Sequence, residues 1–563
     1  MFGLLLSAAS WCAPAPRSVH LTARSAIRAE MVRQDDRSEA AAVPALAPAY
    51  GWYGWNFNEP LPAGWWHVGL RVGPTVGRED AQCLQFGSPN TPGMDLRTFA
   101  AKQFEWTTHG LWLYAARPVK WVNVVKWAGT ARATAPIGWI DLEQATPSLT
   151  TNDAILLDLL RAGDSVTLPE PLPCGNYELY SNPRREGEFS WEEDKGSSKA
   201  RPISRREGCF YVESALRSLT LQTTDKTEGC VLIHYPPFPP ADIPAPPARP
   251  RYPATDEEKV TAQRLELIGP HAIGEKPSLT LLPWALRSAF VTSWDDGYEQ
   301  DMRVAVVLRD LGLKGTFFIN ANSPMVKLAR QLEAQGMEVA AHTWSHPHLS
   351  RCTPERCWLE CAGIRDLLEQ RTGHPIISFA YPFGDSVAYD LEGDYVLRAL
   401  RNAGYWSARW TDTNTFNISS PTDPLQYGVD AEVREAPALI EARWREALRT
   451  EGSVFHLWGH SWTVSDWLRF SSLMSGFARR SDVWYATQGE VFVWRWLRNR
   501  TTVELLEDTQ QRQIVRVSHP WLHPALAKTP LTLKLPEGAT RVLCGTVELG
   551  ITNQTVVLPP TSN

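Results

Sequence analysis

The sequence predicts an α/β protein: a barrel of seven strand–helix units, preceded by β-sandwich-like domains and followed by a small β module. After about residue 266, seven apolar runs alternate with helical stretches, which is the pattern of parallel βα units. Before that point, short aromatic and β-branched runs are broken by Gly, Pro and Asn, which is typical of antiparallel sheets. At 563 residues the chain is also too long for one hydrophobic core.

Residues 1–48 are polar, Ala-rich and without periodicity, and we expect a leader or a disordered tail there. The start, "MFGLLLSAASWCAPAP", has the short apolar segment of a signal peptide, but its first cationic residue is Arg17. The sequence is therefore equally compatible with a secreted or periplasmic protein and with a cytoplasmic one. No stretch is long and apolar enough to form a transmembrane segment.

Two β-rich regions follow this segment. Residues 49–165 contain "GWWHVGLRVG", "HGLWLYAA" and "VKWVNVVKWAG", and we expect a β-sandwich-like domain. Residues 166–235 form either a second β-rich domain or a continuation of the first. The chain has 25 Trp, which serve more often in cores than in gripping sugars, so only an exposed aromatic row would favour sugar binding here.

The clearest boundary is "PPFPPADIPAPPARPRYP", for which we predict a Pro-rich linker over residues 236–265 that is semi-rigid and exposed. The barrel is expected over residues 266–499, and its strands are "AFVTSW", "KGTFFIN", "MEVAAH", "IISFAY", "YWSARW", "SVFHLW" and "DVWYAT". One intervening helix has Thr353 as its N-cap, Pro354 at its first position and Gly373 just past its end. Residues 500–563 again contain short β-like runs and predict a small β module.

Charge and cysteine content exclude some functions. The net charge of -6 and the lack of a basic stripe argue against nucleic acid as a partner. The nine Cys form no CxxC pair and show no zinc-finger spacing. Most are expected to be small buried hydrophobes, so they leave the redox compartment open.

Ionisable side chains follow several predicted strands, and in parallel barrels the reactive groups lie at these carboxyl ends. They are Asp295 and Asp296 after the first strand, His342 and His346 after the third, Arg409 at the fifth, and His456 and His460 at the sixth. Pro347 favours extended backbone at the residue before it, so the two histidines of the third strand are placed on a loop. Two His and a carboxylate are a common ligand set for a catalytic divalent ion.

These residues lie in three short motifs, "TSWDDG", "HTWSH" and "LWGH". In content, order and spacing they resemble the polysaccharide deacetylase (NodB-homology, carbohydrate esterase 4) family over residues 285–499. The resemblance implies a distorted seven-stranded (β/α) barrel. It also implies metal-dependent hydrolysis of acetyl groups, mainly N-acetyl, from a carbohydrate, which yields acetate and a free amine.

The resemblance also implies roles for individual residues: Asp295 as catalytic base, Asp296, His342 and His346 as metal ligands, and His460 as general acid. Zinc is the expected metal, with cobalt, manganese or nickel as alternatives. A bound cation would also balance two adjacent carboxylates, whose charges otherwise repel. A backbone N–H near Tyr381 is expected to hold the oxyanion, and Trp344 and Trp458 are candidate substrate contacts, although packing is the commoner role for Trp.

The third motif, "AYPFG", departs from the resemblance. Many members of the family have an arginine there that orients the catalytic aspartate, and Ala380 takes its place. Arg409 is a candidate for reaching the same aspartate from the fifth strand. It is equally compatible with a purely structural ion pair.

Three functions fit these features. The first is deacetylation of an acetylated carbohydrate. The second is hydrolysis of a non-carbohydrate C–N substrate by the same barrel. The third, a non-catalytic carbohydrate-binding protein, is disfavoured because such a protein needs neither an acid–base pair nor a metal set. The oligomeric state stays open.

Overall fold

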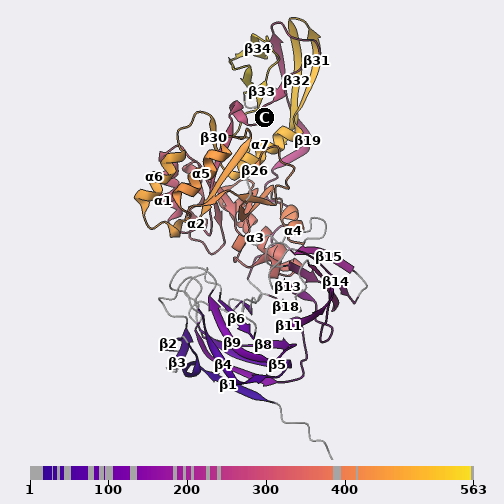
Figure 1. Ribbon diagram of the computed structural model, residues 1–563. Helices are drawn as coiled ribbons and strands as arrows, with labels where there is room; N and C mark the ends of the chain where they lie inside the picture. The colour runs from indigo at the N-terminus through magenta and orange to yellow at the C-terminus, as the bar shows by residue number, and fades with distance from the viewer. Residues whose placement is uncertain are drawn as a thin grey trace, which may run out of the picture. The chain divides into compact units, whose positions relative to one another are not determined.

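The computed structural model describes residues 17–27, 29–33, 39–42, 52–73, 82–87, 94–95, 106–126, 136–181, 187–194, 198–203, 208–223, 229–237, 242–384, 395–413 and 416–559. The chain divides into two compact units, Met1–Pro239 and Pro240–Asn563. Figure 1 labels many of the helices and strands of both, and each unit is described by itself.

The first unit is built from β-strands. They are β1 Ser18–Thr22, β2 Glu30–Arg33, β3 Glu39–Ala42, β4 Trp52–Leu61, β5 Gly64–Val72, β6 Gln82–Phe86, β7 Met94–Asp95, β8 Thr107–Ala115, β9 Val119–Lys126, β10 Ile137–Gln144, β11 Ala154–Ala162, β12 Ser165–Val166, β13 Gly175–Ser181, β14 Gly187–Glu193, β15 Ser198–Ile203, β16 Gly208–Val212, β17 Leu216–Thr223 and β18 Gly229–Tyr235. Among the described residues, β4, β9, β6 and β7 pair in one sheet and the other strands pair in a second, larger one.

The two sheets of this unit share a core, as in a β-sandwich. Tyr53 from β4 and Val122 from β9 are buried in the same cluster as Trp66 from β5 and Leu113 from β8. The alternation of buried and half-buried or exposed residues along β5 is the period-two pattern that places one face of a strand against a core. The described strands of residues 49–165 thus lie in two sheets on one core, and a separate sandwich domain with these bounds stays a prediction.

Residues 166–235 continue the first β-region instead of forming a separate sheet. The joining strand is β11, which pairs in parallel with β8 and antiparallel with β18. Its residues Ile155 and Leu157 are buried in a second core together with Phe210 and Trp191. One sheet thus contributes to two cores.

The expectation that residues 1–48 form only a leader or a disordered tail is wrong for their described part. β1 pairs antiparallel with β10 from Ser18 to Thr22, and β2 and β3 form a hairpin that pairs with β10 through β3. Strand β1, SVHLT, alternates polar and apolar residues, but five residues are a short run, and the prediction missed this period-two signal. It is fixed by backbone pairing with a partner that is distant in the sequence.

The second unit contains the predicted strand–helix alternation. All seven predicted runs are strands: β21 Ser288–Trp294, β22 Gly315–Ile319, β23 Glu338–Ala341, β24 Ser378–Ala380, β25 Ser407–Thr413, β29 Ser453–Gly459 and β30 Val483–Ala486. The same sheet includes the short strands β26 Phe416–Asn417, β27 Tyr427–Val429 and β28 Ala431–Glu432. Strands β29, β21, β22, β23, β24, β25 and β27 are neighbours in that order and parallel, while β30 pairs with β21. The two end strands of this sheet are β26 and β27. Among the described residues these two strands do not pair with each other, so closure into a seven-stranded barrel stays a prediction.

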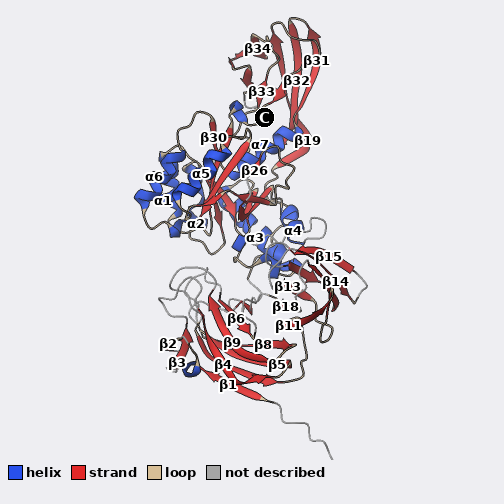
Figure 2. Ribbon diagram, in the orientation of Figure 1, coloured by secondary structure: helices blue, strands red, loops and turns tan. Residues whose placement is uncertain are grey.

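Helices connect these strands (Figure 2). They are α1 Asp301–Asp310, α2 Met325–Ala334, α3 Pro354–Thr372, α4 Tyr395–Ala403, α5 Pro437–Ala447, α6 Trp467–Phe477 and α7 Gln488–Arg500. Helix α3 begins and ends as predicted, because the Thr353 side chain accepts a hydrogen bond from the Arg356 N–H, and Gly373 adopts the left-handed conformation with φ 86°. No helix of the described residues is long and apolar enough to cross a membrane.

The C-terminal β module includes two strands, β19 and β20, that precede the barrel in the sequence. Strand β19 Thr255–Ile268 pairs with β32 Arg512–Leu522 and with β34 Arg541–Cys544. The other strands of the module are β20 Ser278–Leu279, β31 Thr502–Thr509, β33 Thr532–Lys534, β35 Val547–Leu549, β36 Ile551–Thr552 and β37 Thr555–Val557. The predicted linker, residues 236–265, is therefore too long, since its last part is a strand of this module. The first half of β19 is mostly exposed and charged, which concealed the strand in the sequence.

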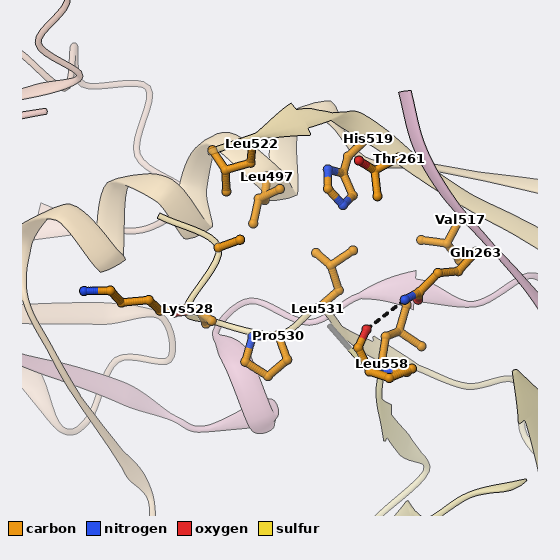
Figure 3. Close-up of a pocket in the computed structure, with 13 residues that line it drawn as sticks. Thr261, Gln263, Leu497, Val517, His519, Leu522, Lys528, Pro530, Leu531 and Leu558 are labelled. Carbon is orange, nitrogen blue, oxygen red and sulfur yellow. Dashed lines mark hydrogen bonds between the residues drawn. The ribbon is translucent and has the colours of Figure 1, made fainter. Parts of the chain in front are cut away.

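A cavity of about 260 Å³ lies between α7 and this module (Figure 3). Its walls are mainly aliphatic, with Leu497 from α7, Val517 from β32 and Leu531 among the lining residues. His519 lines it as well, and its Nδ1 lies 2.8 Å from the Pro520 carbonyl oxygen. The lining includes no carboxylate, so this cavity does not offer the ionisable groups expected of the active site.

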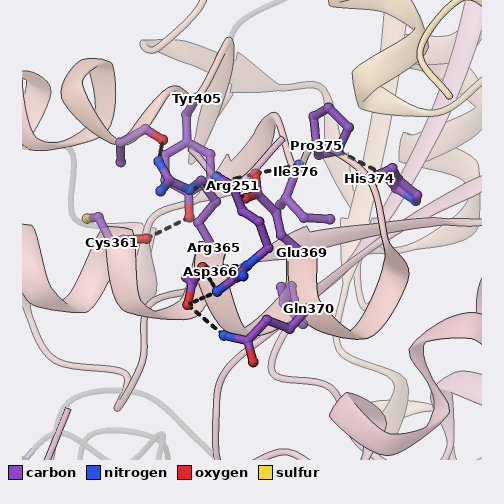
Figure 4. A network of polar contacts seen from close by, with 12 residues as sticks. Arg251, Cys361, Arg365, Asp366, Glu369, Gln370, His374, Pro375, Ile376 and Tyr405 are labelled. Atoms are coloured by element: carbon purple, nitrogen blue, oxygen red, sulfur yellow. Dashed lines mark hydrogen bonds and ion pairs between the residues drawn. The ribbon is translucent and has the colours of Figure 1, made fainter. Parts of the chain in front are cut away.

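The Pro-rich segment is fastened to the second unit and is not simply an exposed spacer. The backbone N–H of Arg251 donates to Glu369 Oε2 at 2.9 Å, and its side chain donates to Asp366 Oδ1 at 3.0 Å (Figure 4). Pro250 lies so close to Gly404 that a Cβ on that glycine would be 2.8 Å from the proline Cγ. The end of the segment therefore packs on α3 and on the residue that follows α4.

We expect Arg251→Ala to loosen this segment without unfolding the unit. The side-chain ion pair is partly exposed, at 43% for Arg251 and 14% for Asp366, so its loss should cost about 1 kcal/mol or less. Limited proteolysis should cut residues 242–253 several-fold faster, while the melting temperature changes little. Arg249→Ala is the matched control, because Arg249 is exposed on the same segment. Equal cleavage rates in the two variants would contradict the fastening.

Candidate active site

The ionisable residues predicted at the strand ends gather at one edge of the parallel sheet. Asp295 and Asp296 directly follow β21, and His460 directly follows the neighbouring strand β29. The Asp295 N–H donates to the Gly459 carbonyl oxygen at 3.1 Å, which ties these two strand ends together. His342 directly follows β23, and His346 lies on the loop that comes next.

The backbone at this edge is strained. Asp296, Thr343 and His346 have φ values of 76°, 64° and 61°, in the left-handed region that residues other than Gly rarely adopt. Hydrogen bonds hold the loop, since the Thr343 hydroxyl accepts from the His346 N–H at 3.0 Å. Glu360 on α3, fully buried, accepts from the Ser345 N–H at 2.8 Å. Such strain is common at functional sites, where the surrounding structure maintains it.

Asp296, His342 and His346 form a compact donor set. One potential ligand atom from each lies within 4.8 Å of the others. Asp296 Oδ1 is 3.1 Å from His346 Nε2 and 3.6 Å from His342 Nε2. The geometry therefore brings together the three residues that the sequence placed in a metal site.

The surroundings of His342 fix its tautomer. Its Nδ1 lies 2.8 Å from the Ala380 carbonyl oxygen, which can only accept, so Nδ1 carries the proton and Nε2 keeps a lone pair. Burial lowers the pKa of His342 to about 4, and the ring is neutral near pH 7. Burial raises the pKa of Asp296, but hydrogen bonding to His346 and the charges of the nearby histidines outweigh it and lower the pKa well below its usual range.

These residues fit a divalent cation. The neutral His342 directs an acceptor nitrogen toward an ionised carboxylate oxygen, an arrangement of two acceptors that a cation between them would stabilise. A backbone carbonyl that accepts from the distal ring nitrogen is also the usual outer partner of a metal-binding histidine. The donor chemistry, two imidazoles and one carboxylate, is that of catalytic zinc sites.

Asp295 is held by a buried arginine. Asp295 is 3% exposed. Arg409 is fully buried and donates a hydrogen bond from Nη2 to Asp295 Oδ1. The guanidinium of Arg409 lies between two rings, with its carbon 5.0 Å from the centre of Phe318 and 5.2 Å from that of Trp458. The contact that the sequence offered as one of two options for Arg409 is thus present.

His460 faces the donor set from β29. Its Nε2 lies 3.9 Å from Asp296 Oδ2, and its ring packs against Trp458 and Trp462 with centroid distances of 5.4 and 5.7 Å. Trp458 therefore contacts both Arg409 and His460. Such contacts fit a packing role that orients these side chains.

Other predicted residues lie differently. The Tyr381 N–H donates to the Arg409 carbonyl oxygen at 3.0 Å, and its hydroxyl donates to the Leu425 carbonyl oxygen, so both of its donors are engaged within the protein. The N–H of Tyr381 itself is thus engaged, and an oxyanion contact from a backbone N–H near Tyr381 stays a prediction. Trp344 is half-buried, and its backbone N–H donates to the Glu360 carbonyl oxygen. It lies on the loop between His342 and His346.

Two further residues near the site were not recognised from the sequence. Phe383 is 40% exposed and has a φ of 60°. The centroid of its ring lies 4.6 Å from that of His346, and 3.8 Å from that of His348, on which it stacks. Asp301 is fully buried at the first position of α1, and burial, followed by the charges of Asp296 and Asp295, raises its pKa well above the usual value. The "PFG" of the third motif is a signal for Phe383, whereas nothing local distinguishes Asp301 from an exposed helix-start acid.

Comparison with known proteins gives one family. Residues 287–407 match the polysaccharide deacetylase family. A chitooligosaccharide deacetylase from Bradyrhizobium sp. (strain ANU 289) is 32% identical over 162 residues, which are 27% of this chain and 66% of that protein. The chain thus spans just under two thirds of this curated relative.

Two solved structures are also similar. A family 4 carbohydrate esterase from Streptomyces lividans, in complex with acetate, is 17% identical with a TM-score of 0.26, and the match covers 36% of this chain and 93% of the esterase. A peptidoglycan deacetylase from Bacillus subtilis is 15% identical with a TM-score of 0.27, covering 37% and 93% of the two chains. The family match includes Asp295, Asp296, His342 and His346, while Arg409 and His460 lie beyond its last residue.

Proposed function

Since residues 287–407 carry a polysaccharide deacetylase domain, we propose that the protein hydrolyses acetyl groups, mainly N-acetyl, from a carbohydrate and releases acetate and a free amine. The observation that carries this proposal is the Asp296, His342 and His346 donor set, which lies beside a separate buried carboxylate, Asp295. A non-catalytic sugar-binding protein has no need of both.

Asp296, His342 and His346 would hold the metal, zinc in the first instance, with cobalt, manganese or nickel as alternatives. When bound, such an ion supplies Lewis acidity, which polarises a carbonyl group and lowers the pKa of water. His342 Nε2 is already unprotonated, because its proton is on Nδ1 and is bonded to the Ala380 carbonyl oxygen. The ligand therefore needs no deprotonation before binding.

Asp295 is the proposed general base. Its carboxylate accepts the proton of the water that attacks the acetyl carbon, and Arg409 fixes the orientation of that carboxylate. Arg409 thus takes the positioning role that the arginine of the third motif has in many family members, where this chain has Ala380. Because Ala380 is on the strand adjacent to Arg409, the guanidinium can reach the same aspartate from the neighbouring strand.

His460 is the proposed general acid. An amine leaves poorly unless it is protonated as the C–N bond breaks, and a histidine opposite the base can donate that proton. The packing of its ring against Trp458 and Trp462 restricts its orientation. After proton transfer the products are acetate and the amino sugar.

We expect His460→Ala to lower kcat on an N-acetyl sugar about 100-fold or more with little change in KM. Hydrolysis of 4-nitrophenyl acetate should fall much less, because a nitrophenolate leaves without protonation. His523→Ala, in the C-terminal module, is the matched control. An equal loss on both substrates would count against a general-acid role.

The substrate is proposed to be an N-acetylated oligosaccharide or polysaccharide of the kind that the curated relative's name specifies, with O-acetylated glycans as a variant. The test is acetate release from a panel of acetylated glycans and simple N-acetyl amides, in metal-replete enzyme and after chelation. Metal-dependent release from a glycan supports the proposal. Release from small amides alone would favour the amidohydrolase alternative, and no release from any substrate would refute both.

A further inference from the structure

Arg409 is the only guanidinium that contacts Asp295 in the described residues, and a second hydrogen bond holds Arg409 itself in place. Its Nε donates to the Ser293 hydroxyl oxygen at 3.0 Å while its Nη2 donates to Asp295. Ser293 and Arg409 are both fully buried. A guanidinium can only donate hydrogen bonds, so it depends on acceptors placed by the surrounding chain.

The contacts continue from Ser293 to two more buried residues. His456 Nε2 lies 2.8 Å from the Ser293 hydroxyl oxygen, and His456 Nδ1 lies 3.3 Å from the Tyr427 hydroxyl oxygen. His456 and Tyr427 are 1% and 2% exposed. The four residues come from four strands of the sheet, β25, β21, β29 and β27, so each bond crosses between strands.

The obligate donor at one end sets the direction of the first bond, from Arg409 to Ser293. Ser293 accepts from Arg409, so its own proton is available for His456 Nε2. We assign that proton to the bond with His456 Nε2, which makes Nε2 an acceptor and places the proton of the neutral ring on Nδ1, beside the Tyr427 hydroxyl. Burial, followed by the charge of Arg409, lowers the pKa of His456 well below its usual value, in agreement with a neutral ring.

We propose that Ser293 and His456 are positioning residues that hold Arg409 against Asp295. The inference rests on the proposed deacetylase function. Removing the Ser293 hydroxyl would leave Arg409 Nε without an acceptor where water does not reach, and the guanidinium would turn to regain one. His456 acts one step further back by orienting the Ser293 hydroxyl so that its oxygen lone pairs face Arg409.

The first test compares Ser293→Ala with Ser293→Thr and with a matched control. Ser293→Ala should lower kcat about tenfold with KM within about twofold, since hydrogen bonds to charged groups are among the strong ones. Ser293→Thr keeps the hydroxyl and should restore most of kcat. Ser288→Ala is the control, because Ser288 is equally buried on the same strand and its hydroxyl bonds Ser453 of β29 at 3.1 Å.

The outcomes separate this inference from the proposed function. If wild type releases acetate and Ser293→Ala matches Ser288→Ala in kcat, the positioning role is wrong and the deacetylase function stands. The role is also wrong if Ser293→Thr is as slow as Ser293→Ala. If metal-replete wild type releases no acetate from any glycan, the proposed function fails and the inference falls with it.

A spectroscopic measurement reports on the hydrogen bonds without turnover. Nitrogen-15 NMR of histidine-labelled protein should show His456 as the neutral Nδ1–H tautomer, assigned by loss of its signals in His456→Gln. Ser293→Ala should shift the Nε2 resonance of His456, and Ser288→Ala should not. A Nε2–H tautomer or a charged ring in wild type would overturn the bond directions and the role of His456.

Discussion

Asp295→Asn is expected to lower kcat for acetate release by about 10²–10⁴-fold, the usual contribution of a general base. The amide has the size and shape of the carboxylate but does not accept a proton from water at neutral pH. Because Asp295 is not part of the three-residue donor set, the variant should still bind one equivalent of metal. Acetate assays and metal analysis on the same preparation measure both quantities.

Asp310→Asn is the matched control, since Asp310 is the last residue of α1 and is exposed. It should behave as wild type in both measurements. If Asp295→Asn retained more than about a tenth of the wild-type kcat, Asp295 would not be the base. Loss of metal in that variant would instead assign Asp295 to the ligand set.

His346→Ala should abolish metal binding at stoichiometric concentrations and with it the activity. Changes to outer partners of a metal site already cost about 10–100-fold in affinity, and removing a ligand should cost at least as much. His346 is one of the three donors, and its side chain is only 10% exposed. A calorimetric titration with zinc measures the change in metal affinity.

His348→Ala is the control for this variant. His348 lies two residues further on the same loop, but its ring stacks on Phe383 and it does not belong to the donor set. It should bind metal with wild-type stoichiometry. Full metal binding by His346→Ala would show that the ion is held by other residues.

Much of the second unit could be predicted because its signals are local. Buried parallel strands appear as continuous apolar runs, and all seven runs are strands of the sheet. The ends of α3 were predictable from Thr353 and Gly373, because the hydrogen bonds of helix ends depend on neighbouring residues. The same holds for the strand-end acids and histidines, since parallel strands direct their carboxyl ends to one edge.

Features that depend on pairing between distant segments were not predictable in this way. The exposed, charged half of β19 resembles a linker until its partner β32 is known. Strand β1 alternates over only five residues, and its partner β10 lies more than a hundred residues away. Long-range backbone pairing of this kind leaves little trace in local composition.

The surroundings of Arg409 are the corresponding case within the candidate site. Its position at the fifth strand was visible in the sequence, but its burial between Phe318 and Trp458 and its bond to Ser293 join four parts of the chain. Ser293 is a small polar residue in an apolar run, and His456 resembles any hydrogen-bonded core histidine. Their proposed role emerges only from the hydrogen bonds that connect them to a buried arginine.

We propose above that the acidic pair and the histidines form one metal-dependent deacetylase site. The most direct test measures acetate released from an N-acetylated chitooligosaccharide by metal-free protein, before and after one equivalent of zinc is added. We expect negligible release before addition, and release with an equal amount of new free amine afterwards. Acetate release that is independent of metal, or no release after reconstitution with zinc, cobalt, manganese or nickel, would contradict it.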